Sequence, residues 1–239
     1  MLTLNGTTQY AYWDAHAAPI QGNVNHNELG GVNGFPLWVC FDFKPAGSGS
    51  WWALALQDQF GTARYAAQLA GSTIQFNDGT AGRSPHAGVQ ANVWQRVLIY
   101  RPDRAVTMTY LDGDAAATDA GDSPWSGGNL MTLGARQEGG NPADLYFGGS
   151  FANVAIGNAI LTAGQRTGCL VGVNPLSLPG VVRYWPLKAD ALDAFGAWPL
   201  TLVNAPTITA VAHPDVDAWP PAAASSFKQQ PGMGGGFAG

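Results

Sequence analysis

Short segments rich in β-branched and aromatic residues recur along the chain, and Gly, Pro, Asn and Asp residues separate them. In the segment 37–43, Leu37, Val39, Phe41 and Phe43 would share one face of a strand, because side chains alternate at period two. Comparable segments predict strands at 2–12, 51–56, 64–69, 73–76, 94–100, 105–111, 114–118, 130–134, 144–156, 181–187 and 198–203. Many short strands without alternating helices are typical of an all-β, antiparallel two-sheet sandwich.

Two local signals refine this pattern. Asp112-Gly113 separates two predicted strands, and Asp-Gly favours a tight hairpin because the turn needs positive φ. Thr162 is a suitable N-cap for a short helix over 162–167, the one helix that the sequence predicts. The connections are therefore expected to be mostly hairpins and loops.

The strand pattern stops near His213. Four prolines and a terminal Gly-Met-Gly-Gly-Gly-Phe-Ala-Gly follow, and this composition cannot build a packed core of its own. We therefore expect one β-sandwich domain over residues 1–212 and an irregular, Pro/Gly-rich C-terminal arm over residues 213–239.

The composition agrees with an all-β fold and excludes several functions. Helix surfaces are usually rich in Glu and Lys, yet the 239 residues include only two glutamates and three lysines. The formal net charge is −5 and no Lys/Arg run is present, so nucleic-acid binding is not expected. No apolar stretch is long enough to span a bilayer, and the N-terminus lacks the features of a signal peptide.

Three stretches, at 94–113, 131–162 and 184–196, carry more specific motifs. The first is a Trp-led strand followed by a hairpin that ends in Asp-Gly, the second is a small-residue strand that leads into a short helix, and the third is a Trp-Pro-Leu segment with downstream acidic residues. Together they resemble concanavalin A-like (laminin-G-like) domains. The third motif usually opens such a domain, whereas here it comes late. The resemblance implies a jelly-roll sandwich with one concave sheet, and in this family that surface and its rim loops often bind carbohydrate or protein.

Hydrolysis is not expected, although glucanases share this fold. Those enzymes use a Glu-x-Asp-x-Glu strand whose carboxylates act as nucleophile and acid/base. The only glutamates here, Glu28 and Glu138, are isolated in Gly-rich loops, and the pairs Asp112/Asp114 and Asp190/Asp193 lie in turn sequences. We therefore predict no catalytic residues and no enzyme activity.

A metal site is likewise not favoured. Calcium is conceivable because Asp112, Asp114, Asp119 and Asp122 crowd one region of the sequence, but Asp is also a preferred turn residue. His26 and Glu28 are two possible ligands and do not make a site. No cofactor is predicted.

Aromatic residues are the remaining candidates for ligand binding. Most of the nine tryptophans, such as Trp38, Trp94 and Trp185, are expected to pack the core. Trp125 instead lies in a polar loop with Asp122 and Asn129, and Trp51 begins a strand beside a Gly/Ser turn. We take these last four residues as candidate ligand contacts, for a sugar or for a protein neighbour; loop aromatics that fold back onto their own core are the alternative.

The two cysteines, Cys40 and Cys169, leave two interpretations open. A disulfide between them would close a long loop. Two buried thiols that act as small hydrophobic residues are the simpler reading when no signal peptide is evident. Neither cysteine belongs to a zinc-type cluster.

These features favour a recognition or assembly role. The first hypothesis is a structural or adhesive protein of a bacteriophage virion, a capsid decoration or tail/fibre component. Such a protein would be made in the host cytoplasm and would contact protein neighbours, its own copies or surface glycans. The alternative is a free carbohydrate-binding module, and a glycoside hydrolase is the third possibility.

Overall fold

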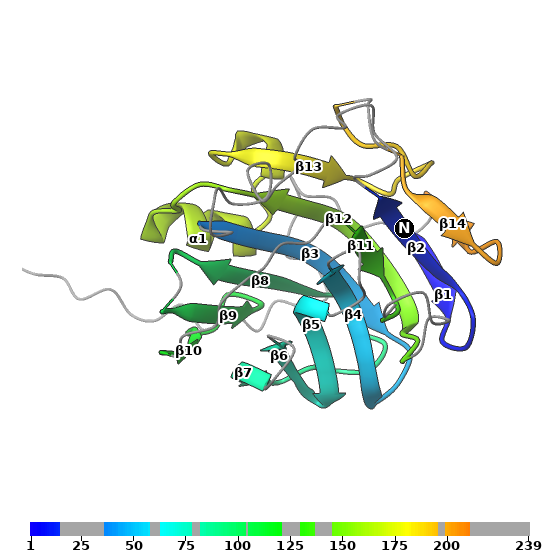
Figure 1. Cartoon of the computed structure of the whole chain (residues 1–239), viewed down its shortest axis with the longest axis horizontal. Coiled ribbons are helices and arrows are strands. Elements are labelled where there is room, and N and C mark those ends of the chain that lie inside the picture. Colours follow the sequence, from blue (N-terminus) through cyan, green and yellow to red (C-terminus); the bar gives the residue numbers. More distant parts are fainter. Residues whose placement is uncertain are drawn as a thin grey trace, which may run out of the picture.

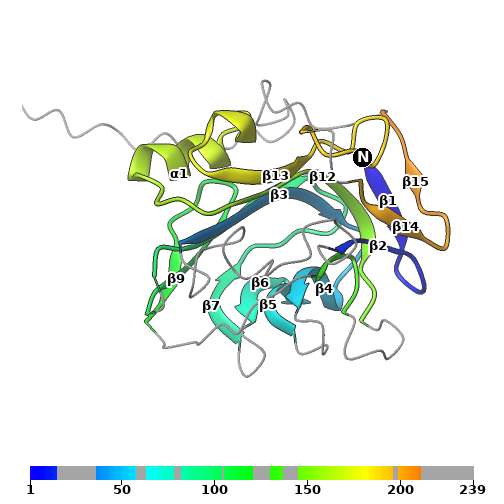
Figure 2. The ribbon, with the colours of Figure 1, turned by 45° about the horizontal axis from the view of Figure 1, so that its top comes forward.

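The structure is a computed structural model that describes residues 1–14, 36–57, 63–77, 82–103, 105–120, 130–136, 145–195 and 199–210. Two antiparallel sheets form the upper and lower layers in Figure 2, and the short helix α1 (Ala163–Leu170) lies on the outer side of the upper one (Figures 1 and 2). The all-β, two-sheet sandwich predicted from the sequence is confirmed. The predicted arm, residues 213–239, lies outside the described residues, so the division into domain and arm stays a prediction.

The larger sheet has eight strands in the order β10-β9-β8-β3-β12-β1-β15, with β13 also paired to β12. Its strands are β1 (Leu2–Asn5), β3 (Leu37–Pro45), β8 (Gln95–Arg101), β9 (Thr107–Leu111), β10 (Ala117–Asp119), β12 (Gly148–Gly157), β13 (Val181–Trp185) and β15 (Thr207–Ile208). Both β1 and β13 pair with β12, through the registers Leu2↔Phe151 and Val154↔Trp185. The late Trp-Pro-Leu segment and the N-terminal strand thus complete the same sheet.

The smaller sheet has seven strands in the order β14-β2-β11-β4-β5-β6-β7. They are β2 (Tyr10–Asp14), β4 (Gly49–Gln57), β5 (Ala63–Gly71), β6 (Thr73–Asn77), β7 (Gly82–Ala87), β11 (Leu130–Leu133) and β14 (Thr201–Val203). The predicted N-terminal strand is in fact divided between the two sheets. The chain turns at Gly6, which has a φ of 75°, and the Asn5 side chain accepts the N–H groups of Thr7, Thr8 and Gln9.

Alternate residues of both sheets form the main core. Phe41 and Phe43 of β3 lie fully buried in it, as the period-two pattern predicted. The rings of Phe147 and Phe151 are tilted by 42° with centroids 4.6 Å apart, and they contact these residues. Phe147 also meets Trp51 of β4 edge-on, so this aromatic packing joins the two sheets.

The opposite face of the eight-stranded sheet is buried as well. Trp38, Cys40 and Leu98 lie there and pack against Cys169 and Leu170 of α1. The helix is longer than the predicted 162–167, but it begins as predicted at the N-cap Thr162. A reciprocal capping box joins Thr162 and Gln165, with the Gln165 N–H donating to Thr162 Oγ1 at 3.3 Å.

Most other strands and the Asp112-Gly113 hairpin lie where the sequence predicted them. Asp112 and Gly113 have φ values of 50° and 84°, as the tight turn requires. Strand β7 was missed because Pro85 interrupts it. Proline is compatible with a strand at the edge of a sheet, and β7 is the edge strand. Within the described part of the chain, no helix has the length and apolar character to cross a membrane.

The close approach of Gly157 to Trp38 gives the first prediction. A Cβ atom at Gly157 would lie 2.1 Å from two carbons of the Trp38 indole, which is fully buried and cannot give way. We expect Gly157→Ala to lower the free energy of unfolding by about 1–3 kcal/mol, measured by urea denaturation. Gly164→Ala is the matched control, because its Cβ would meet nothing within 4 Å. In a helix this change should be neutral or stabilise by up to about 1 kcal/mol. Equal effects of the two changes would contradict the packing argument.

Candidate functional site

The four residues predicted as ligand contacts are only partly described. Asp122, Trp125 and Asn129 lie outside the described residues. Trp51 is half-buried, and its ring meets Phe147 edge-on with centroids 5.9 Å apart and an interplanar angle of 88°. The structure therefore does not test whether these four residues come together, and their role in binding stays a prediction. Of the other tryptophans, Trp38 and Trp185 are fully buried as predicted, and Trp94 is half-buried just before β8.

The outer face of the seven-stranded sheet carries a group of polar side chains on β5 and β6. Ile74 and Phe76 of β6 point into the core, so Gln75 and Asn77 alternate to the outside, where they are half-buried. On β5, Gln68 stands directly opposite Gln75 and is half-buried too. On its other side, β5 pairs with β4, and this register places Gln68 opposite Trp52. We call Trp52, Gln68, Gln75, Asn77 and the nearby Arg136 the amide face.

Hydrogen bonds hold the three amide side chains in one arrangement. Gln68 Oε1 accepts from Gln75 Nε2 at 3.0 Å and from Asn77 Nδ2 at 2.9 Å. Gln68 Nε2 and Gln75 Oε1 have no further hydrogen bond among the described residues, so a donor and an acceptor remain available side by side. The Gln75 amide lies close over Gly82 of β7, where an added Cβ would come within 2.4 Å of it.

Trp52 and Arg136 form the other half of the amide face. The Arg136 guanidinium lies over the Trp52 ring, with Cζ 5.5 Å from its centroid, in a cation–π arrangement. Trp52 also packs with Ala55 and Leu145, which leaves the residue 4% exposed. Its buried Nε1 has no hydrogen-bond partner among the described residues. Buried polar groups are normally paired, so an unpaired donor beside half-exposed amides is a feature to be explained.

Three tyrosines lie on or beside the same outer face, toward the β14 end of the seven-stranded sheet. Tyr10 and Tyr12 of β2 have ring centroids 6.2 Å apart, and Tyr146 lies 6.4 Å from Tyr10. Burial raises the pKa of Tyr10, and the neighbouring Tyr146 and Tyr12 raise it further. The Tyr10 phenol is therefore a neutral hydrogen-bonding group at physiological pH.

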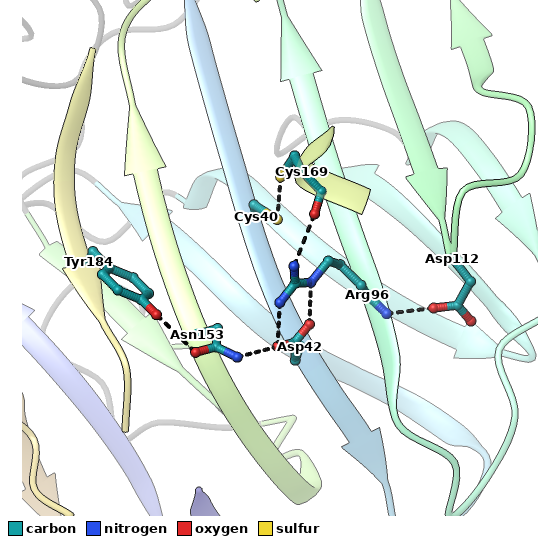
Figure 3. A network of polar contacts seen from close by, with 7 residues as sticks. All are labelled: Cys40, Asp42, Arg96, Asp112, Asn153, Cys169 and Tyr184. Carbon is teal, nitrogen blue, oxygen red and sulfur yellow. Dashed lines mark hydrogen bonds and ion pairs between the residues drawn. The ribbon is translucent and has the colours of Figure 1, made fainter. Parts of the chain in front are cut away.

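A buried pair of charges lies elsewhere, beneath α1 (Figure 3). Asp42 accepts from Arg96 Nε at 2.5 Å and from Nη2 at 2.7 Å, and the two residues are 0% and 1% exposed. Asn153 donates to Asp42 at 2.6 Å and accepts from Tyr184 Oη, while Arg96 Nη1 donates to the Cys169 carbonyl. Burial works to lower the pKa of Arg96, but the attraction and hydrogen bonds of Asp42 outweigh it, and the pKa lies above its usual range. This network fastens α1 to the sheet and faces no solvent.

Of the aspartates considered for catalysis or calcium, Asp112 and Asp193 stabilise turns, and Asp119 lies in β10 within 4.0 Å of Arg83. Asp112 accepts from Arg96 N at 2.6 Å and from Gln95 Nε2 at 2.9 Å, which ties the hairpin turn to β8. Asp193 accepts the backbone N–H groups of Tyr184 and Phe195. Burial raises the pKa of both carboxyl groups. Asp122 lies outside the described residues. Among the described residues, no group of three or more His, Cys, Asp or Glu side chains is arranged so that it could hold a metal ion.

The sequence did not identify the amide face, because its members lie on separate strands. The period-two pattern of Thr73 to Asn77 does place Gln75 and Asn77 on one face. The register of β5 against β6 and β4, which brings Gln68 between Gln75 and Trp52, carries no local sequence signal. That register was the missing information.

The ion pair Asp42–Arg96 gives the second prediction. Asp42→Asn would leave the Arg96 guanidinium buried without a counter-charge, so we expect the free energy of unfolding to fall by about 3–5 kcal/mol in denaturant titrations. Asp103→Asn is the control, because Asp103 is exposed and an Asn oxygen can still accept the N–H groups of Ala105 and Val106. That change should stay within about 0.5 kcal/mol of the unsubstituted protein. A loss below 1 kcal/mol for Asp42→Asn would show that the pair does not hold this region.

Comparison with known proteins supports the class of fold. No family model matches the sequence, and no curated protein sequence matches it. Among solved structures, a heptameric SAP-like pentraxin from Limulus polyphemus matches with a TM-score of 0.61 and 12% identity, over 87% of this chain and 94% of that one. A putative carbohydrate binding protein from Bacteroides ovatus matches with a TM-score of 0.57 and 15% identity, over 87% of this chain and 62% of that one. Domains LG4-5 of the mouse laminin alpha1 chain match with a TM-score of 0.46 and 11% identity, over 65% of this chain and 41% of that one.

The pentraxin and the Bacteroides protein show the fold that this chain shares. The chain is an antiparallel two-sheet β-sandwich whose strands are arranged as in these two proteins, which agrees with the sandwich that the sequence motifs implied. At 12% and 15% identity, what the chain shares with the pentraxin and the Bacteroides protein is the arrangement of its strands.

Proposed function

We propose that this chain is a non-catalytic binding protein that contacts carbohydrate through the amide face of its seven-stranded sheet. The observation that carries the proposal is the shared carbonyl of Gln68, which holds the amides of Gln75 and Asn77 in one half-exposed group. The structurally similar Bacteroides protein is described as a putative carbohydrate binding protein, which supports a proposed role in carbohydrate binding.

The chemistry of the amide face suits sugar hydroxyl groups. An amide offers both a donor and an acceptor, and adjacent hydroxyl groups of a sugar ring need both. Because the Gln68–Gln75–Asn77 hydrogen bonds fix these groups before a ligand arrives, little side-chain entropy remains to be lost on binding. The buried Trp52 borders the amides, and the Arg136 guanidinium over its ring adds one positive charge. This composition favours a neutral or acidic glycan.

The non-catalytic part of the proposal rests on where the carboxylates lie. Asp42 is fully buried and paired with Arg96, and Asp112 is engaged by a backbone and a side-chain donor. The two glutamates are separated by more than a hundred residues of sequence and lack acidic neighbours. A glycosidase needs two carboxyl groups flanking its substrate, and no such pair is visible on the described amide face.

A glycan array provides the third prediction. We expect at least one hit, and Gln68→Ala should weaken it about tenfold or more, because it removes the acceptor that Gln75 and Asn77 share. Gln75→Ala should have a similar effect. Gln90→Ala, which removes an exposed amide outside this face, should leave the dissociation constant unchanged.

Two outcomes would contradict the amide face as the site. One is an array without a hit in calcium-containing buffer. The other is a hit that Trp125→Ala abolishes and Gln68→Ala leaves intact, which would place the site at the loop predicted from the sequence. Urea denaturation of each variant separates loss of binding from loss of folding.

As the finer part of the proposal, the chain works as a structural or adhesive component of a bacteriophage virion, as a capsid decoration or tail/fibre protein. A sandwich domain joined to a Pro/Gly-rich segment suits a particle in which the segment lies against a neighbouring subunit or a second copy of the chain. Binding of host surface glycans would then be an adhesive function of the particle.

The fourth prediction tests this setting. Mass spectrometry of purified virions should detect the chain in stoichiometric amounts, and its absence would refute the virion role. Light scattering of the purified protein should show a change in oligomeric state when residues 213–239 are removed. An unchanged size would make those residues a passive tail.

A further inference from the structure

We propose that Cys40 and Cys169 are a disulfide-forming pair that locks helix α1 onto the eight-stranded sheet. The two sulfur atoms lie 2.7 Å apart, only about 0.7 Å beyond the length of an S–S bond. Both residues are buried, 1% and 0% exposed respectively, and both are thiols in this structure. The fold thus brings together two cysteines that are 129 residues apart in the sequence.

The surroundings keep the two thiols in this position. Cys40 lies in the middle of β3, whose neighbours β8 and β12 pair with it on both sides. Cys169 is the penultimate residue of α1, and its carbonyl accepts from Arg96 Nη1 at 3.0 Å. Because Arg96 is itself held by Asp42, the last turn of the helix has one defined place on the sheet (Figure 3). Neither cysteine can move away without breaking this network.

The folded protein protects these thiols from reaction. The hydrogen bond with Cys40 raises the pKa of the Cys169 thiol, burial raises it further, and Arg96 only partly opposes the two effects. The thiolate is the reactive form in disulfide exchange, so the folded dithiol reacts slowly. The bond therefore forms during folding, or when α1 transiently leaves the sheet.

The oxidant is a disulfide, either a small molecule such as oxidised glutathione or a protein dithiol oxidase. One cysteine thiolate attacks this disulfide and gives a mixed disulfide, and one thiol leaves. The second cysteine then attacks the protein sulfur of the mixed disulfide, the Cys40–Cys169 bond forms, and the second thiol leaves. The protein loses two protons and two electrons, and the oxidant is reduced to two thiols.

A covalent bond at this position has a clear physical consequence. An eight-residue helix is too short to be stable alone, so α1 depends on its contacts with the sheet. The bond would close a loop of more than a hundred residues, and long loops give large entropic stabilisation in the chain-entropy model. The reduced protein, in contrast, holds the helix on the sheet by noncovalent contacts, among them apolar packing, the Arg96 bond to the Cys169 carbonyl and the cation–π contact of Arg166 with Tyr100.

The fifth prediction is measured on the unsubstituted, full-length chain. The protein is refolded in a buffer with excess oxidised glutathione, quenched in acid, and alkylated under denaturing conditions with N-ethylmaleimide. Intact mass should show a monomer with no added maleimide, two hydrogens lighter than the dithiol form. The reduced sample should carry two maleimides. The oxidised form should melt about 4–15 °C above the reduced form.

The double variant Cys40→Ala/Cys169→Ala is the control, and its melting temperature should be the same with and without reductant. Each single variant, Cys40→Ser or Cys169→Ser, should remove the oxidised monomer species. The proposal is overturned if the refolded chain takes up two maleimides, or if it carries glutathione or forms only disulfide-linked dimers. Equal melting temperatures of the oxidised and reduced chains would overturn the locking role.

Discussion

Burial of both faces of the eight-stranded sheet is the constraint on which the rest of the molecule depends. All seven residues of β8 and all ten of β12 are buried, and so are eight of the nine in β3. A sheet that is covered on one side only would need polar residues on the other side, at every second position. Here α1 and the segments around it cover the second side, and the few polar groups trapped there must satisfy one another. The Asp42–Arg96–Asn153–Tyr184 network is the result of that requirement.

The same constraint determines where a ligand can bind. The outer side of the eight-stranded sheet is occupied by α1 along β3 and β8, and its inner side is the core. The outer face of the seven-stranded sheet is the remaining broad surface, and there the exposure differs from strand to strand. Ala55 and Thr132 in its middle are fully buried, whereas Gln68, Gln75 and Asn77 toward its β7 edge remain half-exposed. The half-exposed polar groups described on this face therefore lie near that edge, where binding is proposed.

Much of the fold follows from local sequence signals, since period-two patterns identify most strands. The Asp112-Gly113 turn also lies where the sequence predicts it, because Asp and Gly tolerate the positive φ that a tight turn requires. Thr162 caps the helix as predicted, because its side chain accepts a backbone N–H that has no partner inside the helix. What could not be predicted depends on contacts between distant segments. The partition of the N-terminal strand between two sheets, the meeting of Cys40 with Cys169, and the alignment of Gln68 with Gln75 all result from register. Strand β7 escaped prediction for another reason, since its Pro85 is tolerated only because the strand lies at an edge. The loop holding Trp125, the site that the sequence favoured, lies outside the described residues.

The two proposed sites, the buried Cys40–Cys169 pair and the amide face, are physically separate. Cys40, Cys169 and the ion pair lie outside one sheet, and the amide face lies outside the other. Packed sheets are about 10 Å apart, with the aromatic core of Phe41, Phe147 and Phe151 between them. Free-energy effects of changes at such distances usually add, because no side chain is shared. The packed helix, the ion pair and the two cysteines therefore lie on one side of the sandwich, and the half-buried amides lie on the other. A Cys40–Cys169 bond, as proposed, would strengthen the helix-covered side without touching the amide face.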